Sequence, residues 1–366
     1  MFAERITKVQ NLMRLDNVDA LLLSVGADLP YFIGYEAMPL ERLTMLIIRD
    51  EGNPTLVIPQ LERARVTERP TIFNIREWGE TEDPIEIVAT ALTGSVRVAI
   101  GDTTWTRFTI ELLKRMPSID LLRANPITSQ LRSIKSTEEL ERLQQAASAV
   151  DKIAYRLQNG QIELIGKTER EISEELGRQI ISEGHSKVNF AIVAAGENAA
   201  SPHHEAGERR IQKSEIVLCD FGGTMYGGDG VGYCSDVTRC VWTGNPPQEF
   251  VEMYGVLQEA QRKQVQEATH GTPAQQVDRV GRQIISAAGY GEFFVHRTGH
   301  GIGVEAHEEP YIVEGNIDPI RSGNVFSIEP GIYIPQKWGI RLEDIVAVTE
   351  SGPLSLNTVN HDLATH

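Results

Sequence analysis

The sequence predicts an α/β (α+β) chain made of two domains, and three observations indicate this. The chain has 366 residues, which is more than one hydrophobic core usually contains. Short apolar runs alternate with amphipathic segments in its first part. A strong helix start follows at residue 136. We therefore expect one domain over residues 1–133 and a second over residues 134–366.

The first domain is expected to alternate strands and helices. Short apolar runs predict four strands, at Ala20–Val25, Met45–Ile48, Thr55–Ile58 and Val96–Ile100. Amphipathic stretches near residues 2–15 and 106–116 predict helices. These segments together describe an α/β domain.

The second domain is expected to begin with a helix and to contain two similar halves. Ser136 and Glu139 have the spacing of a capping box, which opens a helix that runs to about residues 159–160. The hexapeptide GRQIIS occurs at residues 177–182 and again at 281–286, each time late in an amphipathic stretch. This repeat indicates two related α/β halves, and a cleft between such halves is a favoured place for a site.

Charge and cysteine content exclude several classes of function. The formal net charge of −16 argues against nucleic acid and anionic membranes as partners, because both bind basic surfaces. The N-terminal residues are too charged for a signal peptide, and no stretch has the roughly 18 apolar residues of a membrane span. Three cysteines are too few for a disulfide framework. We therefore expect a cytoplasmic protein.

Two aspartates lie at the ends of apolar strands. The run IVLC leads into Asp220, and Asp236 begins the run that ends at Trp242. Six glycines between the two aspartates favour a hairpin, which would place the carboxylates side by side. Burying an unpaired carboxylate is costly, so such residues must be paired or bound to a metal.

A second pair of acidic residues lies in the last strands. Glu329 is in the middle of the apolar segment 324–334, and Glu343 is in the segment 339–348. The short connection PQKWG predicts a hairpin between them. Arg341 is two residues before Glu343 and therefore shares its face of the strand.

Histidines gather between these two pairs of acids. The segment HRTGHGIGVEAHEEP holds His296, His300 and His307, with glycines on both sides of His300. One imidazole and four carboxylates form a hard, oxygen-rich set that suits two divalent cations. Manganese is the preferred ion, with cobalt or zinc as alternatives, and two dications balance four carboxylates.

The pattern resembles the pita-bread metallopeptidases. The resemblance rests on the motifs HRTGHGIGVEAHEEP, SIEPGIY and RLED and on five residues in order: Asp220, Asp236, His300, Glu329 and Glu343. This family includes methionine aminopeptidase, Xaa-Pro aminopeptidase (aminopeptidase P) and Xaa-Pro dipeptidase (prolidase). The segment PYFIGY at residues 30–35 resembles the creatinase/prolidase N-terminal domain, which methionine aminopeptidases lack. The resemblance thus implies that domain followed by a pita-bread catalytic domain with two pseudo-symmetric halves.

The resemblance also implies a role for each metal ligand. Asp236 and Glu343 bridge the two metals, Asp220 binds one metal, and His300 with Glu329 completes the other. The two aspartates are sixteen residues apart, more than is usual in the family. Asp229 in the lengthened loop is therefore an alternative to Asp236.

Further residues are implied to act on the substrate. His296 and His307 contact the substrate and steady the developing oxyanion, and Glu329 moves the proton from water to the leaving nitrogen. His203 matches a histidine that binds substrate in the family, with the adjacent His204 as the alternative.

The expected activity is hydrolysis of the Xaa-Pro bond in small peptides with proline at the second position. A dipeptidase (prolidase) is preferred over an aminopeptidase P that acts on longer peptides, and a non-catalytic peptide- or protein-binding relative is the remote alternative. A dipeptidase needs a cation for the free carboxylate of proline. Arg341 is one candidate, although it could instead hold a ligand carboxylate, and Arg297 and Arg42 are others. The family further implies a homodimer.

Overall fold

The computed structural model describes residues 1–366 and consists of two compact units. Unit 1 comprises residues 1–132 and 227–232, and unit 2 comprises residues 133–226 and 233–366. Residues 227–232 are the glycine-rich tip of the connection after strand β8. This tip therefore belongs by its contacts to unit 1, although its position in the sequence lies within the predicted second domain.

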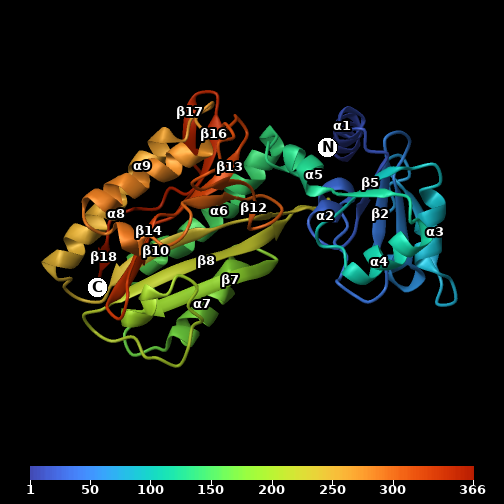
Figure 1. Ribbon diagram of the computed structural model, residues 1–366. Helices are drawn as coiled ribbons and strands as arrows, with labels where there is room; N and C mark the ends of the chain where they lie inside the picture. Colours follow the sequence, from blue (N-terminus) through green and yellow to red (C-terminus); the bar gives the residue numbers. More distant parts are fainter. The chain divides into compact units, whose positions relative to one another are not determined.

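Unit 1 is built on one six-stranded mixed sheet with the order β4-β3-β2-β1-β5-β6 (Figure 1). Its strands are β1 (Ala20–Leu23), β2 (Met45–Arg49), β3 (Thr55–Pro59), β4 (Asn74–Trp78), β5 (Arg97–Ile100) and β6 (Asp120–Arg123). Its helices are α1 (Phe2–Asp16), α2 (Asp28–Ile33), α3 (Pro84–Ala91), α4 (Thr106–Arg115) and α5 (Asn125–Arg132), with a 3-10 turn η1 (Gln60–Arg65).

The apolar runs account for the inner strands of this sheet. The four expected strands form as β1, β2, β3 and β5, and the two expected helices form as α1 and α4. Strands β4 and β6 were not expected, because their sequences NIREW and DLLR are too polar to be recognised as apolar runs. They form as parallel neighbours at the two edges of the sheet, where polar side chains can reach water.

The first half of unit 2 contains a pair of helices followed by a sheet in which β7, β8 and β10 are antiparallel and β18 pairs parallel with β10. Its elements are α6 (Thr137–Gln158), α7 (Glu169–Ser182), β7 (Lys187–Ala195), η2 (Gly196–Ala200), β8 (Ile216–Tyr226), β9 (Gly232–Cys234) and β10 (Val237–Trp242). The expected capping box is present at the start of α6, where Ser136 accepts from the Glu139 backbone and Glu139 bonds back. This sheet has the order β18-β10-β8-β7, with β9 paired to β8.

The second half repeats the order helix, helix, sheet. Its elements are α8 (Gln248–Glu267), α9 (Ala274–Ala287), η3 (Gly291–Phe293), β11 (Gly299–Gly301), β12 (Glu308–Ile312), β13 (Val325–Ile328), β14 (Gly331–Ile334), β15 (Trp338–Arg341), β16 (Asp344–Thr349), β17 (Gly352–Ser355) and β18 (Ala364–Thr365). The repeated hexapeptide GRQIIS lies in α7 and again in α9, the second helix of each pair. The two halves thus use the same helical sequence at the same place.

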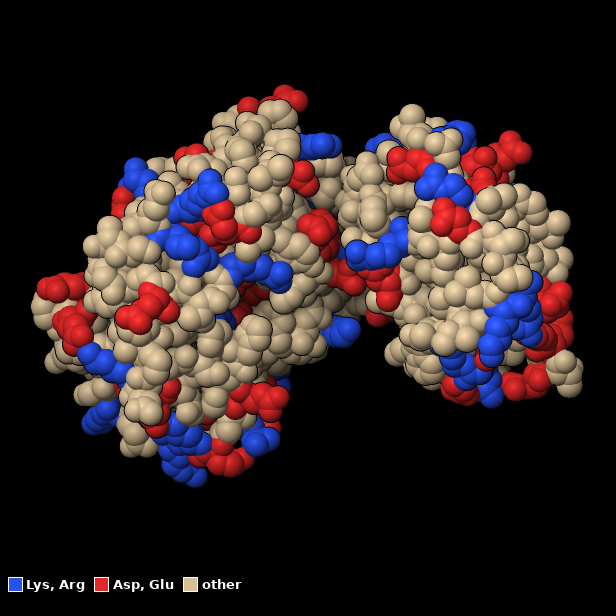
Figure 2. Space-filling view, in the orientation of Figure 1, with Lys and Arg blue, Asp and Glu red and all other residues tan.

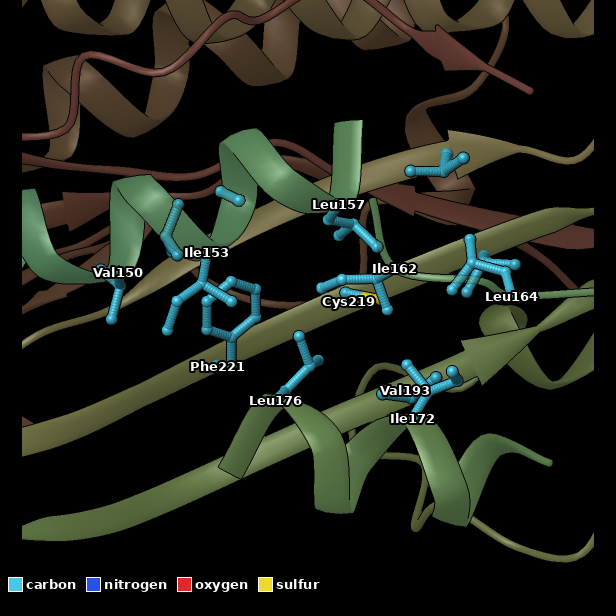
Figure 3. Packing of buried hydrophobic residues seen from close by; sticks show 14 of the residues in the cluster. Val150, Ile153, Leu157, Ile162, Leu164, Ile172, Leu176, Val193, Cys219 and Phe221 are labelled. Carbon is cyan, nitrogen blue, oxygen red and sulfur yellow. The ribbon is translucent and has the colours of Figure 1, made fainter. Parts of the chain in front are cut away.

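Apolar packing fixes the site-bearing strand β8 against the helices. Figure 3 shows Leu157 of α6 and Leu176 of α7 directed toward the strand that carries Cys219 and Phe221. All four of these side chains are fully buried. Burial of each large apolar side chain contributes about 1.5–3 kcal/mol, so β8 is held along its length.

No helix in the structure combines the length and apolar character needed to cross a bilayer. The face of the molecule in Figure 2 carries acidic and basic side chains in mixed groups rather than one basic patch.

Candidate metal centre and active site

Strands β8 and β10 pair antiparallel, as the glycines between them predict. Their register sets Thr238 opposite Asp220 and Val237 opposite Phe221. Asp236 immediately precedes β10 and is therefore close to Asp220. Gly222 permits this, because a Cβ atom there would be 2.0 Å from the carbonyl oxygen of Ser235.

His300 is held in a strand that only glycine could flank. It is the middle residue of β11, which lies between β12 and β13. A Cβ atom on Gly299 would be 1.8 Å from the carbonyl oxygen of Ser327, and one on Gly301 would be 2.3 Å from that of Glu309. The backbone N–H of His300 donates to the Ser327 hydroxyl at 3.1 Å. The glycines therefore allow close strand packing that fixes the imidazole.

Glu329 and Glu343 follow β13 and β15 in the chain. Strands β14 and β15 form the expected second hairpin. The hydroxyl of Thr238 donates to Glu343 Oε2 at 2.6 Å, and a bridge joins the backbones of these two residues. Fully buried Arg239 donates to the carbonyl oxygen of Glu343 at 2.6 Å and pairs with Asp344 at 2.8 Å. Thr238 and Arg239 thus position Glu343 beside β10.

The candidate ligands gather around one cavity of about 520 Å³. Ligand atoms of Asp236, His300 and Glu343 all lie within 4.8 Å of one another, and all three residues are buried. Asp220 and Glu329 line the same cavity. The remaining lining residues are Phe190, Ile192, Pro202, His203, His296, Arg297, His307 and Arg341. The volume lies within the range of small-ligand sites.

The electrostatic environment of these carboxylates favours the binding of cations. Burial, together with neighbouring carboxylates, raises the pKa values of Asp236 and Glu343 well above their usual range. One buried oxygen of Asp220 and one of Asp236 have no hydrogen-bond partner. A buried acceptor without a partner is costly, and divalent metal ions satisfy carboxylate oxygens directly. The residues present therefore fit a metal centre.

Glu329 has a different environment from the other acids. Burial acts to raise its pKa, but the hydrogen bond and charge of His300 together with His296 and Arg341 lower it to about 2. His300 Nε2 lies 3.2 Å from a Glu329 oxygen, and the Ser327 hydroxyl donates to the same carboxylate at 3.0 Å. This carboxylate is therefore ionised and oriented from two sides.

Arg341 begins a chain of hydrogen bonds along the cavity wall. Its guanidinium is bonded to Asp220 and donates to the Tyr333 hydroxyl at 2.8 Å. Tyr333 lies 2.9 Å from His296 Nε2, and His296 Nδ1 lies 2.7 Å from the carbonyl oxygen of Arg297. Because that carbonyl can only accept, Nδ1 carries the proton and Tyr333 donates to Nε2. Both ring nitrogens of His296 are thus engaged.

His307 contrasts with His296, because no hydrogen bond holds its ring. Its ring centroid is 3.9 Å from that of His300. Burial, with the charges of His300 and Arg297, lowers the pKa of His307 to about 4. The imidazole is therefore neutral at physiological pH and keeps an N–H to donate into the cavity.

The structure separates the two adjacent histidines of the loop after η2. His203 lines the cavity. His204 instead lies 2.8 Å from buried Glu169, which also accepts from the backbone N–H of Ala195 at 2.9 Å and of Gly207 at 3.2 Å. Glu169 thus fastens both ends of the loop that carries His203.

Asp229 and Arg42 make their contacts within unit 1. The carbonyl oxygen of Asp229 accepts from Arg69 at 3.0 Å, and its carboxylate accepts from the backbone N–H of Val231. Arg42 is bonded to Glu41 and Glu80 on the surface. Neither Asp229 nor Arg42 lines the cavity.

Sequence reasoning missed Tyr333, Glu169 and the apolar wall formed by Phe190 and Ile192. A signal existed for Tyr333, which is four residues after Glu329 in an extended segment and so shares its face. No local signal marks Glu169, because its contacts are with residues 26 to 38 positions later in the chain.

Two family models match the chain. Residues 141–350 match Metallopeptidase family M24, and residues 5–134 match the Creatinase/Prolidase N-terminal domain. The probable dipeptidase PepE of Mycobacterium tuberculosis is 38% identical over 352 residues, which cover 94% of this chain and 91% of that protein.

Solved structures give the same result for the fold. Dipeptidase PepE from Mycobacterium ulcerans has a TM-score of 0.92 at 38% identity, covering 100% of this chain and 97% of its own. Recombinant prolidase from Thermococcus sibiricus has a TM-score of 0.93 at 36% identity, covering 100% and 99%. The chain is therefore a member of metallopeptidase family M24 with a creatinase/prolidase N-terminal domain. It is a metallopeptidase, and its relatives include enzymes named dipeptidase and prolidase.

Proposed function

We propose that this enzyme hydrolyses the Xaa-Pro bond of dipeptides with two divalent metal ions, manganese in the native protein. The observation that carries the proposal is the convergence of four carboxylates and His300 on one cavity. Relatives named dipeptidase and prolidase support the substrate class. Cobalt and zinc are the alternative metals, since both accept oxygen and imidazole ligands.

The five residues would share two ions. Asp236 and Glu343 would bridge them, Asp220 would hold one, and His300 with Glu329 would hold the other. When bound, the metals supply Lewis acidity, which polarises the scissile carbonyl and makes a water molecule acidic. Arg341 keeps Asp220 in place through their ion pair.

The remaining steps belong to side chains of the protein. Glu329 takes the proton of the attacking water and passes it to the proline nitrogen as the C–N bond breaks. The neutral His307 can donate its N–H to the oxygen that becomes negative. His296 contacts the substrate from the cavity wall, where Tyr333 fixes its ring. His203 lines the cavity beside Pro202 and binds the substrate.

The site is suited to proline because it does not need a peptide N–H. An Xaa-Pro bond has none, so an enzyme that grips that group is at a disadvantage. Phe190 and Ile192 instead offer an apolar wall on the same cavity. Such a wall can hold the pyrrolidine ring by shape.

The alternative activity is that of an aminopeptidase P, which uses the same metal centre on longer peptides. The test compares an Xaa-Pro dipeptide with the same peptide extended by two residues after proline. A dipeptidase cleaves the shorter substrate with the higher kcat/KM. Equal or faster cleavage of the longer peptide would assign the enzyme to the aminopeptidase branch.

The cellular setting completes the proposal. The enzyme would act in the cytoplasm on small peptides, as a homodimer whose chains each contain the domains 1–133 and 134–366. Ultracentrifugation of the purified protein tests the dimer, with a single species of twice the chain mass as the expected result.

A further inference from the structure

The repeated hexapeptide GRQIIS has a different environment in each half of unit 2. In α7 a Cβ atom on Gly177 would meet no atom closer than the Val188 side chain at 3.8 Å, which is ordinary contact. Arg178 pairs with Glu175 of the same helix, and its side chain is 64% exposed. Neither Gly177 nor Arg178 lines the cavity of the metal centre. The first copy therefore forms a helix without any contact to the site.

The glycine of the second copy lies where another side chain needs space. A Cβ atom on Gly281 would be 2.2 Å from Cδ of Gln264, so the buried Gln264 side chain occupies that space. Figure 1 shows α8, which carries Gln264, beside α9. The Gln264 amide donates to the Thr298 hydroxyl at 2.6 Å. Gly281 thus allows α8 to contact the segment that leads to His300.

The arginine of the second copy binds the same segment directly. The Arg282 guanidinium donates to both oxygens of Asp278, one turn earlier in α9, at 2.9 Å each. It also donates to the carbonyl oxygens of Phe294 and His296, at 2.8 Å each. All three guanidinium nitrogens are therefore engaged, in a planar fork that lysine cannot reproduce.

Residues 294–298 depend on these contacts for their position. The segment belongs to no helix or strand. Backbone carbonyls need donors, and those of Phe294 and His296 receive them from Arg282 rather than from a sheet. The Arg282 Cζ atom also lies 4.0 Å from the centroid of the Phe294 ring, which meets the His296 ring at an interplanar angle of 86°. Arg282 therefore fixes both the backbone of His296 and the ring packed beside it.

Asp278 extends this hold to Thr298. Fully buried, it accepts from the backbone N–H of Thr298 at 3.1 Å and from its hydroxyl at 2.9 Å. The carbonyl oxygen of Thr298 in turn accepts from the backbone N–H of Glu329 at 2.8 Å. The ion pair between Asp278 and Arg282 thus secures the segment at alternate residues.

We infer that Arg282, held by Asp278, is a positioning residue for His296. This rests on the proposed function, in which His296 contacts the substrate from the cavity wall. Tyr333 and the carbonyl oxygen of Arg297 orient the imidazole through its two nitrogens, whereas Arg282 fixes the backbone from which it projects. A misplacement of about 1 Å in such a group can lower the rate by about 10²-fold.

The experiment makes the same substitution in both copies of the hexapeptide. With manganese-loaded enzyme, Arg282→Met should lower kcat for an Xaa-Pro dipeptide by about 10- to 100-fold and change KM by less than about 3-fold. Arg178→Met is the matched control and should behave as wild type. Arg282→Lys should recover part of kcat, because it keeps the charge and a donor without the fork. The metal content should be the same in all variants.

A double-mutant cycle separates positioning of His296 from a general loss of structure. In a His296→Ala background, Arg282→Met should lower kcat/KM by less than about 3-fold, because the group that it positions is gone. Arg282→Lys carries the same cycle, so the test does not depend on the folding of Arg282→Met. Equal losses in both backgrounds, an unchanged kcat in Arg282→Met, or less bound metal in that variant would overturn the inference.

Histidine NMR gives a second readout that needs no turnover. The protein is labelled with ¹⁵N at histidine and loaded with zinc, and the His296 ring signals are identified by their absence in His296→Ala. They should shift in Arg282→Met and stay in place in Arg178→Met. Unshifted signals in Arg282→Met would overturn the inference whether or not the enzyme cleaves Xaa-Pro peptides. A shift in a protein that cleaves none would refute the proposed function alone.

Discussion

The sheets of the two units differ in the strands that carry acidic residues. In unit 1 the four inner strands, β3, β2, β1 and β5, contain no Asp or Glu, and acids appear only in the edge strands as Glu77 and Asp120. In unit 2 the inner strand β8 carries Asp220, which is only 8% exposed. An acid in an inner strand of this protein is therefore either a candidate ligand, as Asp220 is, or paired with a buried arginine, as Asp344 of β16 is with Arg239, whereas an acid at an edge strand can remain hydrated.

The environments of the acids explain the difference. Glu77 and Asp120 pair with arginines at positions open to water, where an ion pair contributes little. Burial and neighbouring carboxylates instead raise the pKa values of Asp236 and Glu343, and neither carboxylate forms an ion pair with an arginine. The cluster is stable as a set of carboxylates only when cations are bound to it.

The largest effect is expected at the metal bridge. Asp236→Asn should lower kcat/KM by at least about 10³-fold and reduce the bound metal, because a bound metal contributes several kcal/mol to transition-state stabilisation. Asp229→Asn is the matched control, since its carboxylate lies in the tip 227–232. Kinetics and elemental analysis of both variants check this, and a dead Asp229→Asn with an active Asp236→Asn would reverse the assignment.

The next effect concerns the two histidines beside the ligand His300. His307→Ala and His296→Ala should each lower kcat/KM by about 10²–10⁴-fold, the range of acid–base and oxyanion groups. The metal content should not change, because neither residue is proposed as a ligand. Loss of metal from His307→Ala would show instead that it binds an ion.

A smaller effect is expected at Glu169. Hydrogen bonds, including the one with His204, hold the pKa of this carboxyl below its usual value of 4.5, although burial acts to raise it. Glu169→Gln should lower the free energy of unfolding by about 1–3 kcal/mol at pH 7 and raise KM by loosening the His203 loop.

The direction of the Glu169 pKa shift determines how its contribution to the free energy of unfolding depends on pH. Because the pKa of Glu169 is lower in the folded state, its stabilisation is complete above pH 4.5 and is lost as the pH falls through the lowered value. Urea unfolding should therefore show the gap between wild type and Glu169→Gln narrowing toward pH 3. A gap that stays constant would mean that the carboxylate charge does not contribute.

The smallest effect is expected on the exposed surface of unit 1. Arg42→Gln removes the ion pair with Glu80, whose oxygen is 3.0 Å away. Exposed pairs of this kind rarely affect stability, so the melting temperature and kcat/KM should both match wild type. A marked rise in KM for dipeptides would instead return Arg42 to the candidates for carboxylate binding.

The predictions from the sequence were most successful where polar residues occur at positions that the neighbouring apolar residues indicate are buried. Acids in apolar strands and the glycines around His300 were visible as local patterns, and the strands β8, β10, β14 and β15 formed as expected. The polar edge strands β4 and β6 were missed because their pairing, and not their composition, makes them strands. The choice between His203 and His204 depends on Glu169, 35 residues before His204, and no local pattern encodes that contact.

The most direct test of the account is a titration of metal-free protein with Mn²⁺, in which bound metal and hydrolysis of an Xaa-Pro dipeptide are measured on the same samples. Two ions per chain should bind, and full activity should appear only as the second is taken up, because Asp236 and Glu343 are proposed to bind both. Full activity with one ion per chain, or hydrolysis by the metal-free protein, would contradict the dinuclear mechanism.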